Sequence, residues 1–215
     1  MTGDSRQEAV NERVDRILTD PSVPALVEAF YETEGPFAGA TFDTLGANPP
    51  DAFVSDDLLA VTLLDVIVKP PAFRCILGDD AALLGSLLRP VSANTDLWDA
   101  SDADLDAAAA AWERLRGYGG IKKVTAGKLL ARKRPRLIPI VDSVVEATIG
   151  APNQRYWRSF RATLQDPDRR HSLAALRPHS LDDRVSLLRV LDVAIWMRHS
   201  NGTNAKRARR RAGCA

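Results

Sequence analysis

Cysteine, aromatic residues and long apolar runs are all scarce in this sequence of 215 residues. The two cysteines, Cys75 and Cys214, are too few for a disulfide framework or for a four-cysteine zinc or iron–sulfur site. The three histidines are scattered, with no carboxylate at the spacing of metal ligands. We therefore expect no metal, no cofactor and a reducing compartment.

Nothing in the sequence has the length or apolarity of a membrane span or a secretory signal. The longest apolar run, Leu58 to Val68, is interrupted by Thr62 and Asp65 and is far shorter than the ~20 residues that a span needs. The first thirty residues include the acids Asp4, Glu8, Glu12 and Asp15 and contain no apolar stretch of signal-peptide type. We expect a cytoplasmic protein that is neither secreted nor embedded in a membrane.

What the chain has in quantity is helix-forming sequence. Hydrophobic residues make up 45% and charged residues 27%, which is typical of a folded globular protein. Apolar residues recur at helical spacing in most segments, as at Val10, Val14 and Ile17, and no alternating strand pattern is present. The sequence predicts one all-α domain, residues 1–202, with helical lobes 1–100 and 101–202, followed by a disordered basic tail, residues 203–215.

Capping residues locate several helix boundaries. Ser101, with Asp104 three residues later, predicts a capping box for a helix that ends at Gly117. Ser55 and the acids after it predict the start of one buried helix that runs to Val68 and stops before Pro70. A basic helix is predicted from 122 to 134, an extended stretch from 137 to 141, and helices over 154–165 and 181–199.

Positive charge is concentrated in two segments without acids. Residues 122–136 contain seven Lys and Arg residues and residues 205–211 contain five, which leaves 17 basic residues against 28 acidic ones elsewhere. A basic surface on an acidic body is expected of a protein that meets a polyanion in one place. The alternative is a solvated basic helix and a disordered tail that bind nothing.

The segment from Gly117 to Val145 combines a glycine-rich turn, a basic helix, an apolar extended stretch and an aspartate that opens another helix. It reads GYGGIKKVTAGKLLARKRPRLIPIVDSVV. In this order it resembles the helix-hairpin-helix DNA glycosylase superfamily, whose members carry a Gly-hydrophobic-Gly hairpin, a Thr-Ala helix and a Val-Asp-x-x-Val segment. Aligning Thr125 and Ala126 with the Thr-Ala pair places Val141 and Asp142 on Val-Asp without a gap, and the resemblance covers residues 112–150.

The resemblance implies an all-α, DNA-glycosylase-like fold of two lobes, duplex DNA as the partner, and a role for each matching residue. Glycines at the hairpin tip allow backbone N–H groups at a helix N-terminus to approach a phosphate, and a basic helix adds charge. A carboxylate beside an extruded nucleotide can stabilise positive charge at the sugar or orient water. The DNA-binding candidates in the hairpin and its helix are Gly119, Gly120, Lys122, Lys123, Thr125 and Lys128. The catalytic candidate is Asp142, and the same residue is also predicted to be a simple helix N-cap.

Two departures from the superfamily pattern limit the chemistry. Lys122 stands where the second hairpin glycine is found, and Val124 stands where bifunctional members carry the lysine that forms a Schiff base. The resemblance therefore implies a monofunctional DNA N-glycosylase that uses water and does not cut the strand. The wider chain, with DDLLAVTLLDV and KRPRLIPIVDSVV, also resembles a bacterial family of unknown function, which implies no activity.

A second candidate DNA contact lies just after the aspartate. Arg155, Arg158 and Arg161 fall on one face of a predicted helix, interleaved with aromatic residues that could stack on a base. The alternative is that the aromatic residues pack in the core and the arginines face water. For the whole protein, the rival to a DNA glycosylase is a non-catalytic helix-hairpin-helix protein that binds DNA or another partner.

Overall fold

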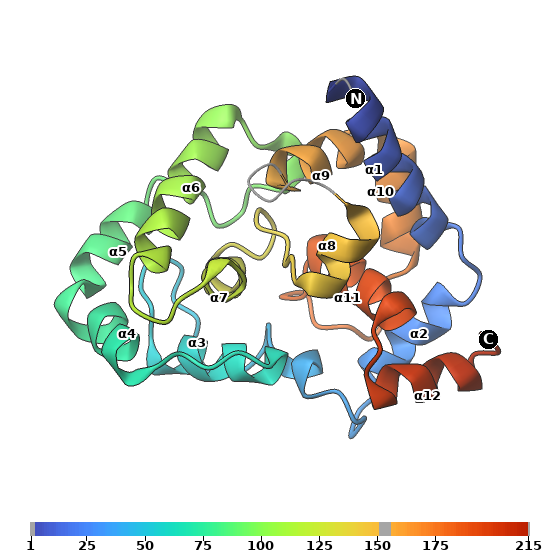
Figure 1. Ribbon diagram of the computed structural model, residues 1–215, viewed down its shortest axis with the longest axis horizontal. Helices are drawn as coiled ribbons and strands as arrows, with labels where there is room; N and C mark the ends of the chain where they lie inside the picture. Colours follow the sequence, from blue (N-terminus) through green and yellow to red (C-terminus); the bar gives the residue numbers. More distant parts are fainter. Residues whose placement is uncertain (1–2, 151–155, 215) are drawn as a thin grey trace. The chain divides into compact units, whose positions relative to one another are not determined.

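The computed structural model (Figure 1) describes residues 3–150 and 156–214. All regular secondary structure in these residues is helical, which confirms the predicted all-α class. No helix in this part of the chain is long and apolar enough to cross a membrane. The same residues contain no group of three or more His, Cys, Asp or Glu side chains that could hold a metal ion.

The chain forms two compact units, one of which is inserted into the other. Unit 1 comprises Met1–Ala40 and Val141–Ala215, and unit 2 comprises Thr41–Ile140. The lobe boundary predicted from the sequence lies between residues 100 and 101 instead. A unit made of two separate chain segments is difficult to predict from local sequence. The two parts of unit 1 are joined only by contacts between residues far apart in the chain.

Unit 1 is organised around α11 (Leu187–His199), nine of whose residues are buried. Helix α11 packs against α2, α8, α10 and α12, and α1 packs against α8, α9 and α10. The other helices of the unit are α1 (Gly3–Leu18), α2 (Val23–Phe30), α8 (Ser143–Ile149), α9 (Tyr156–Leu164), α10 (Pro167–Ala175) and α12 (Thr203–Arg211).

Unit 2 places the two longest of its helices, α6 (Asp102–Arg116) and α7 (Lys123–Lys133), in contact with each other. Helix α6 also packs on α5, and α7 contacts α3 and η2. The shorter elements are α3 (Ser55–Ala60), η2 (Val61–Leu64), α4 (Pro70–Arg74), η3 (Cys75–Asp79), α5 (Ala81–Leu88) and η4 (Leu97–Asp99). The 3₁₀ turn η1 (Ala38–Thr41) lies where the chain passes from unit 1 to unit 2.

Several predicted boundaries are confirmed and others are wrong. The Ser101 capping box is present, with Ser101 Oγ accepting from the Asp104 N–H. The single helix predicted from 55 to 68 is instead broken, because the backbone tightens to 3₁₀ at η2 and Asp65 adopts a left-handed conformation. Helix α11 begins at Leu187 rather than 181, since the Ser186 hydroxyl caps its first turn.

The segment predicted to be a disordered tail forms α12. Ala205 and Ala208, one turn apart, are buried on the side of α12 that packs against α2 and α11. Arg209 donates to the carbonyl oxygens of Met197 and Ser200 at 2.6 and 2.7 Å, at the C-terminal end of α11. The prediction of disorder was wrong because these two alanines and one arginine anchor a helix that is otherwise strongly basic.

Candidate functional site

A tight, glycine-containing turn joins α6 to α7 in unit 2. Tyr118 and Ile121 are buried at its two ends, and the Ile121 N–H donates to the Tyr118 carbonyl at 3.0 Å. Gly119 and Gly120 between them are exposed. The two buried side chains therefore anchor the turn to the unit while the glycine backbone faces solvent.

The backbone conformation of the turn favours glycine at position 120. Its φ of +90° lies in a region that residues with a side chain rarely adopt. A Cβ atom at this position would also lie 3.1 Å from Cδ of Lys69. Lys69 therefore lies against the turn and adds a third exposed lysine beside it, which the sequence analysis missed because no local signal links position 69 to position 120.

The N-terminus of α7 follows the turn directly. Lys122 occupies the N-cap position in an extended conformation, and its side chain makes no capping hydrogen bond. The first N–H groups of a helix have no partner within the helix, so they are available to an acceptor from outside. Lys122 and Lys123 are exposed at this end, whereas Thr125 is buried.

Helix α6 adds an aromatic ring and a further cation next to the same end of α7. Trp112 Nε1 donates to the Lys123 carbonyl at 3.3 Å, and the Arg116 guanidinium lies 4.6 Å from the centre of the Trp112 ring. We call the set Lys69, Arg116, Gly119, Gly120, Lys122 and Lys123 the hairpin surface.

The rest of the basic segment does not belong to a surface. Lys128, Arg132, Lys133 and Arg134 are all buried in unit 2, each with no more than 7% of its area exposed. Lys128, which the sequence analysis assigned to DNA, donates to the Leu64 carbonyl at 2.7 Å. The expectation that the basic run 122–136 contributes a basic surface is therefore wrong for these four residues, and Lys128 is not available to a phosphate.

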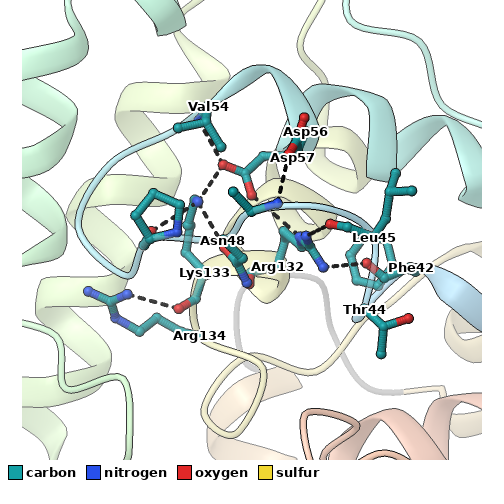
Figure 2. Close-up of polar contacts among 12 residues, drawn as sticks. Phe42, Thr44, Leu45, Asn48, Val54, Asp56, Asp57, Arg132, Lys133 and Arg134 are labelled. Carbon is teal, nitrogen blue, oxygen red and sulfur yellow. Dashed lines mark hydrogen bonds and ion pairs between the residues drawn. The ribbon is translucent and has the colours of Figure 1, made fainter.

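Two of the buried cations, Arg132 and Lys133, converge on Asp57, as Figure 2 shows. Asp57 is fully buried and contacts both Lys133 Nζ and Arg132 Nε. It also accepts from the Val54 N–H at 2.8 Å, at the start of α3. Burial lowers the pKa of Lys133, and the nearby Asp57 opposes that shift.

Backbone carbonyls of neighbouring loops accept from most of the remaining donors of Arg132, Lys133 and Arg134, and Arg134 also pairs with Asp51 at 2.8 Å. Lys133 Nζ lies 2.8 Å from Asn48 Oδ1, and Asn48 in turn donates to the Arg132 carbonyl at 2.7 Å. The carbonyl acceptors are Phe42 and Leu45 for Arg132, Pro49 for Lys133, and Pro50, Leu88 and Val91 for Arg134. This cluster fixes the connector 42–54 to α7, which is a structural role.

Asp142 lies in unit 1, and its predicted role as an N-cap is confirmed. Its Oδ1 accepts from the N–H groups of Val144 and Val145 at 2.9 and 3.0 Å, in the first turn of α8. Its Oδ2 accepts no hydrogen bond from the residues that the structure describes, and the side chain is half-buried. Oδ1 therefore caps α8, and Oδ2 has no hydrogen-bond donor among the described residues.

The predicted arginine face of α9 is described only in part. Arg155 lies outside the described residues, and Arg158 is exposed. Tyr156 and Phe160 are buried on the other side of α9, as the alternative interpretation of the aromatic residues expected. Burial and the charge of Glu146 raise the pKa of Tyr156 to about 12.

Comparison with known proteins gives one match. The model of a family described as "Family of unknown function (DUF6308)" matches residues 23–199, and the chain therefore belongs to that family. This agrees with the expected resemblance to a family of unknown function. No curated protein and no solved structure matches the chain. The resemblance to helix-hairpin-helix glycosylases accordingly depends on the sequence of residues 112–150 alone.

Proposed function

We propose that this member of a family of unknown function binds duplex DNA, and that the hairpin surface contacts the DNA backbone. The observation that carries the proposal is the position of Lys122 and Lys123, which are exposed at the uncapped N-terminus of α7 next to an exposed glycine turn. Backbone N–H groups and lysines at one helix end form a suitable partner for a phosphate.

The geometry of the turn favours an extended polyanion over an isolated ion. The exposed glycines allow a bulky backbone to approach the α7 N–H groups closely, because no Cβ projects at either position. Lys69 beside Gly120 and Arg116 over Trp112 add positive charge beyond a single phosphate, although Arg116 also faces Glu113 at 3.4 Å. Successive phosphates of a nucleic acid are the ligand that several neighbouring cations would bind.

The sharper form of the proposal is water-dependent removal of an unusual base, with Asp142 as the catalytic carboxylate. Support comes from the alignment of Asp142 with the superfamily aspartate and from its Oδ2 atom, which the helix cap does not use. The rival is a non-catalytic DNA-binding protein, which is favoured by Lys122 and Val124 at positions where glycosylases of the superfamily carry glycine and lysine.

Salt dependence of DNA binding tests the proposal directly. Each neutralised phosphate contributes about −0.9 to the slope of log K against log salt. We expect Lys122→Glu/Lys123→Glu to weaken binding to a 20-base-pair duplex and to reduce the slope by about 2. The measurement is fluorescence anisotropy over a series of salt concentrations.

The matched control is Arg6→Glu/Arg89→Glu, which changes the net charge equally at two exposed positions outside the hairpin surface. It should leave the slope within experimental error of wild type. Equal effects of the two double variants would indicate a response to net charge alone. An unchanged slope in Lys122→Glu/Lys123→Glu would remove the hairpin surface from the DNA contact.

A further inference from the structure

A separate basic groove lies within unit 1. It has a volume of about 920 Å³ and is formed by α1, α8 and the C-terminal end of α11. Its described charged and titratable residues are Arg13, Arg16, Asp20, Arg198 and His199. The remaining described lining is small or aliphatic, with no aromatic ring: Ile17, Ser143, Val144, Ala147, Thr148 and Asn201.

The one acid among these residues is already paired. Asp20 accepts from Arg198 Nε at 2.7 Å and from the Ser22 hydroxyl and N–H at 2.6 and 2.9 Å. Arg198 therefore compensates the charge of Asp20. The positive charge that remains in the groove comes from α1, where Arg13 and Arg16 share one face at a spacing of three residues.

Neither Arg13 nor Arg16 is strongly neutralised by described residues. Arg13 Nη1 donates to the carbonyl of Ile149 at 2.7 Å, which orients the guanidinium but carries no full negative charge. Arg16 faces Glu12 at 3.5 Å, with both side chains about 70% exposed, and pairs of this kind contribute little. Arg13 is thus held in place without an acidic partner, and the weak, exposed pair of Arg16 leaves its guanidinium accessible to an anion.

The positive charge around the groove also affects the pKa of His199. Burial first, and then the charges of Arg198 and Arg209, lower the pKa of its imidazole, with Asp20 opposing the shift. Its ring makes no hydrogen bond or ion pair with the described residues. The imidazole lines the groove and has no hydrogen-bond partner among the described residues. A bound anion would favour its protonated form.

We propose that this groove binds phosphate groups, with Arg13 and Arg16 as the principal ligands and His199 as a further donor. Guanidinium groups match the oxygens of a phosphate with two parallel N–H donors, and the volume is in the usual range for small-ligand sites. Because no Phe, Tyr or Trp is among the described lining residues, recognition depends on charge. The inference does not rest on the hairpin surface, which belongs to unit 2.

The probe for the test is pyrophosphate, and the readout is the NMR titration of the His199 ring in the full chain. Pyrophosphate should raise the pKa of His199, and a rise of one unit would mean tenfold tighter binding to the imidazolium form. His171 and His179, which do not line the groove, serve as internal references and should not shift. A His199 pKa that is unchanged at millimolar pyrophosphate would overturn the proposal.

Charge-removing variants on α1 locate the site. Arg16→Gln should weaken pyrophosphate binding several-fold, whereas Arg6→Gln, exposed on the same helix but outside the groove, should not. Arg13→Gln should weaken binding as well, and its melting temperature shows whether loss of the Ile149 contact has also disturbed α8. Equal weakening by Arg6→Gln and Arg16→Gln would overturn the proposal, since it would indicate non-specific attraction.

Two sources of phosphate are separated by a second titration. A short single-stranded oligodeoxynucleotide is compared with pyrophosphate on the wild type and on Arg16→Gln. If the oligonucleotide competes with pyrophosphate and depends on Arg16, the groove accepts the backbone of a nucleic acid. If pyrophosphate binds and the oligonucleotide does not compete, the groove accepts a free phosphorylated metabolite. Either result supports a phosphate site, and binding of neither ligand overturns it.

Discussion

Asp57 supplies the negative charge that two buried cations share. Lys133 and Asp57 have fully buried side chains, and Arg132 is 1% exposed. Moving charges out of water is unfavourable by several kcal/mol for each ion unless a partner and hydrogen bonds compensate. In unit 2 the compensation is nearly complete, because carbonyl oxygens of the connector accept from the remaining donors. Loss of the single carboxylate would leave the cations uncompensated.

We expect Asp57→Asn to destabilise the protein by about 3–5 kcal/mol, the usual effect of removing one partner from a buried ion pair. Asparagine keeps the size of the side chain, so the effect reports charge rather than packing. The measurement is urea unfolding followed by circular dichroism. Arg136→Gln is the control, because its pair with Asp96 is half-exposed on the arginine side and should contribute no more than ~1 kcal/mol. Similar values for both variants would contradict a charged, desolvated cluster.

Asp142 can be tested for two roles with one substitution. Asp142→Asn keeps an oxygen that can accept from Val144 and Val145, so stability should change by less than ~1 kcal/mol. If wild type releases a base from a panel of alkylated, deaminated and oxidised substrates, the same variant should lose that activity, since the charge that stabilises the transition state is gone.

The products of that assay distinguish the mechanisms. With Val124 at the lysine position, wild type should leave an intact abasic site, and borohydride should trap no adduct between protein and DNA. Retained activity in Asp142→Asn at an unchanged melting temperature would exclude Asp142 as the catalytic group. Absence of base release from every substrate would favour the non-catalytic DNA-binding protein.

At the scale of elements, the features that sequence reasoning located are those fixed by neighbours in the chain. The Ser101 capping box and the Asp142 cap each join residues no more than three apart, and the predicted basic helix 122–134 differs from α7 by one residue at each end. The break at Asp65 and the order of α12 were missed, because packing against other elements decides both.

The same distinction applies to the candidate site. The exposed glycines and Lys122 of the turn were predicted correctly as residues near one helix end, since the turn is a local structure. The assignment of Lys128 to DNA was wrong. Its acceptor, the Leu64 carbonyl, is 64 residues away in the sequence, so no local pattern reveals that contact. Lys133 likewise meets Asn48 across 85 residues. A segment without acids can therefore be buried, provided that remote carbonyls and carboxylates compensate its charge.

At the scale of the whole molecule, charges of opposite sign are nearly equal in number, and many of them pair within a unit. The 29 Lys and Arg residues almost balance the 28 acids, and unit 1 joins its helices through pairs such as Arg169 with Asp15 and Arg198 with Asp20. The first pair links α10 to α1, and the second links α11 to the loop that follows α1. Protonation of the acids should therefore weaken the packing of the helices as well as change the net charge.

Acid denaturation tests this view of the molecule. Burial opposes ionisation of Asp20, but Ser22 and Arg198 together lower its pKa to about 2, against an unfolded value of 3.8. The folded state thus binds fewer protons than the unfolded state at low pH, so the stability that Asp20 contributes is present above pH 3.8 and is lost as the pH falls toward 2.

We expect wild type to lose stability over this range and Asp20→Asn to lose less, because the asparagine has no proton to bind. The measurement is the urea midpoint of each protein at pH 7, 4 and 2.5. Glu8→Gln, an exposed acid of α1 without an ion pair to the described residues, is the control and should follow wild type. If Asp20→Asn and wild type lose the same stability between pH 4 and 2.5, the Asp20 carboxylate does not join α11 to the end of α1 through its charge.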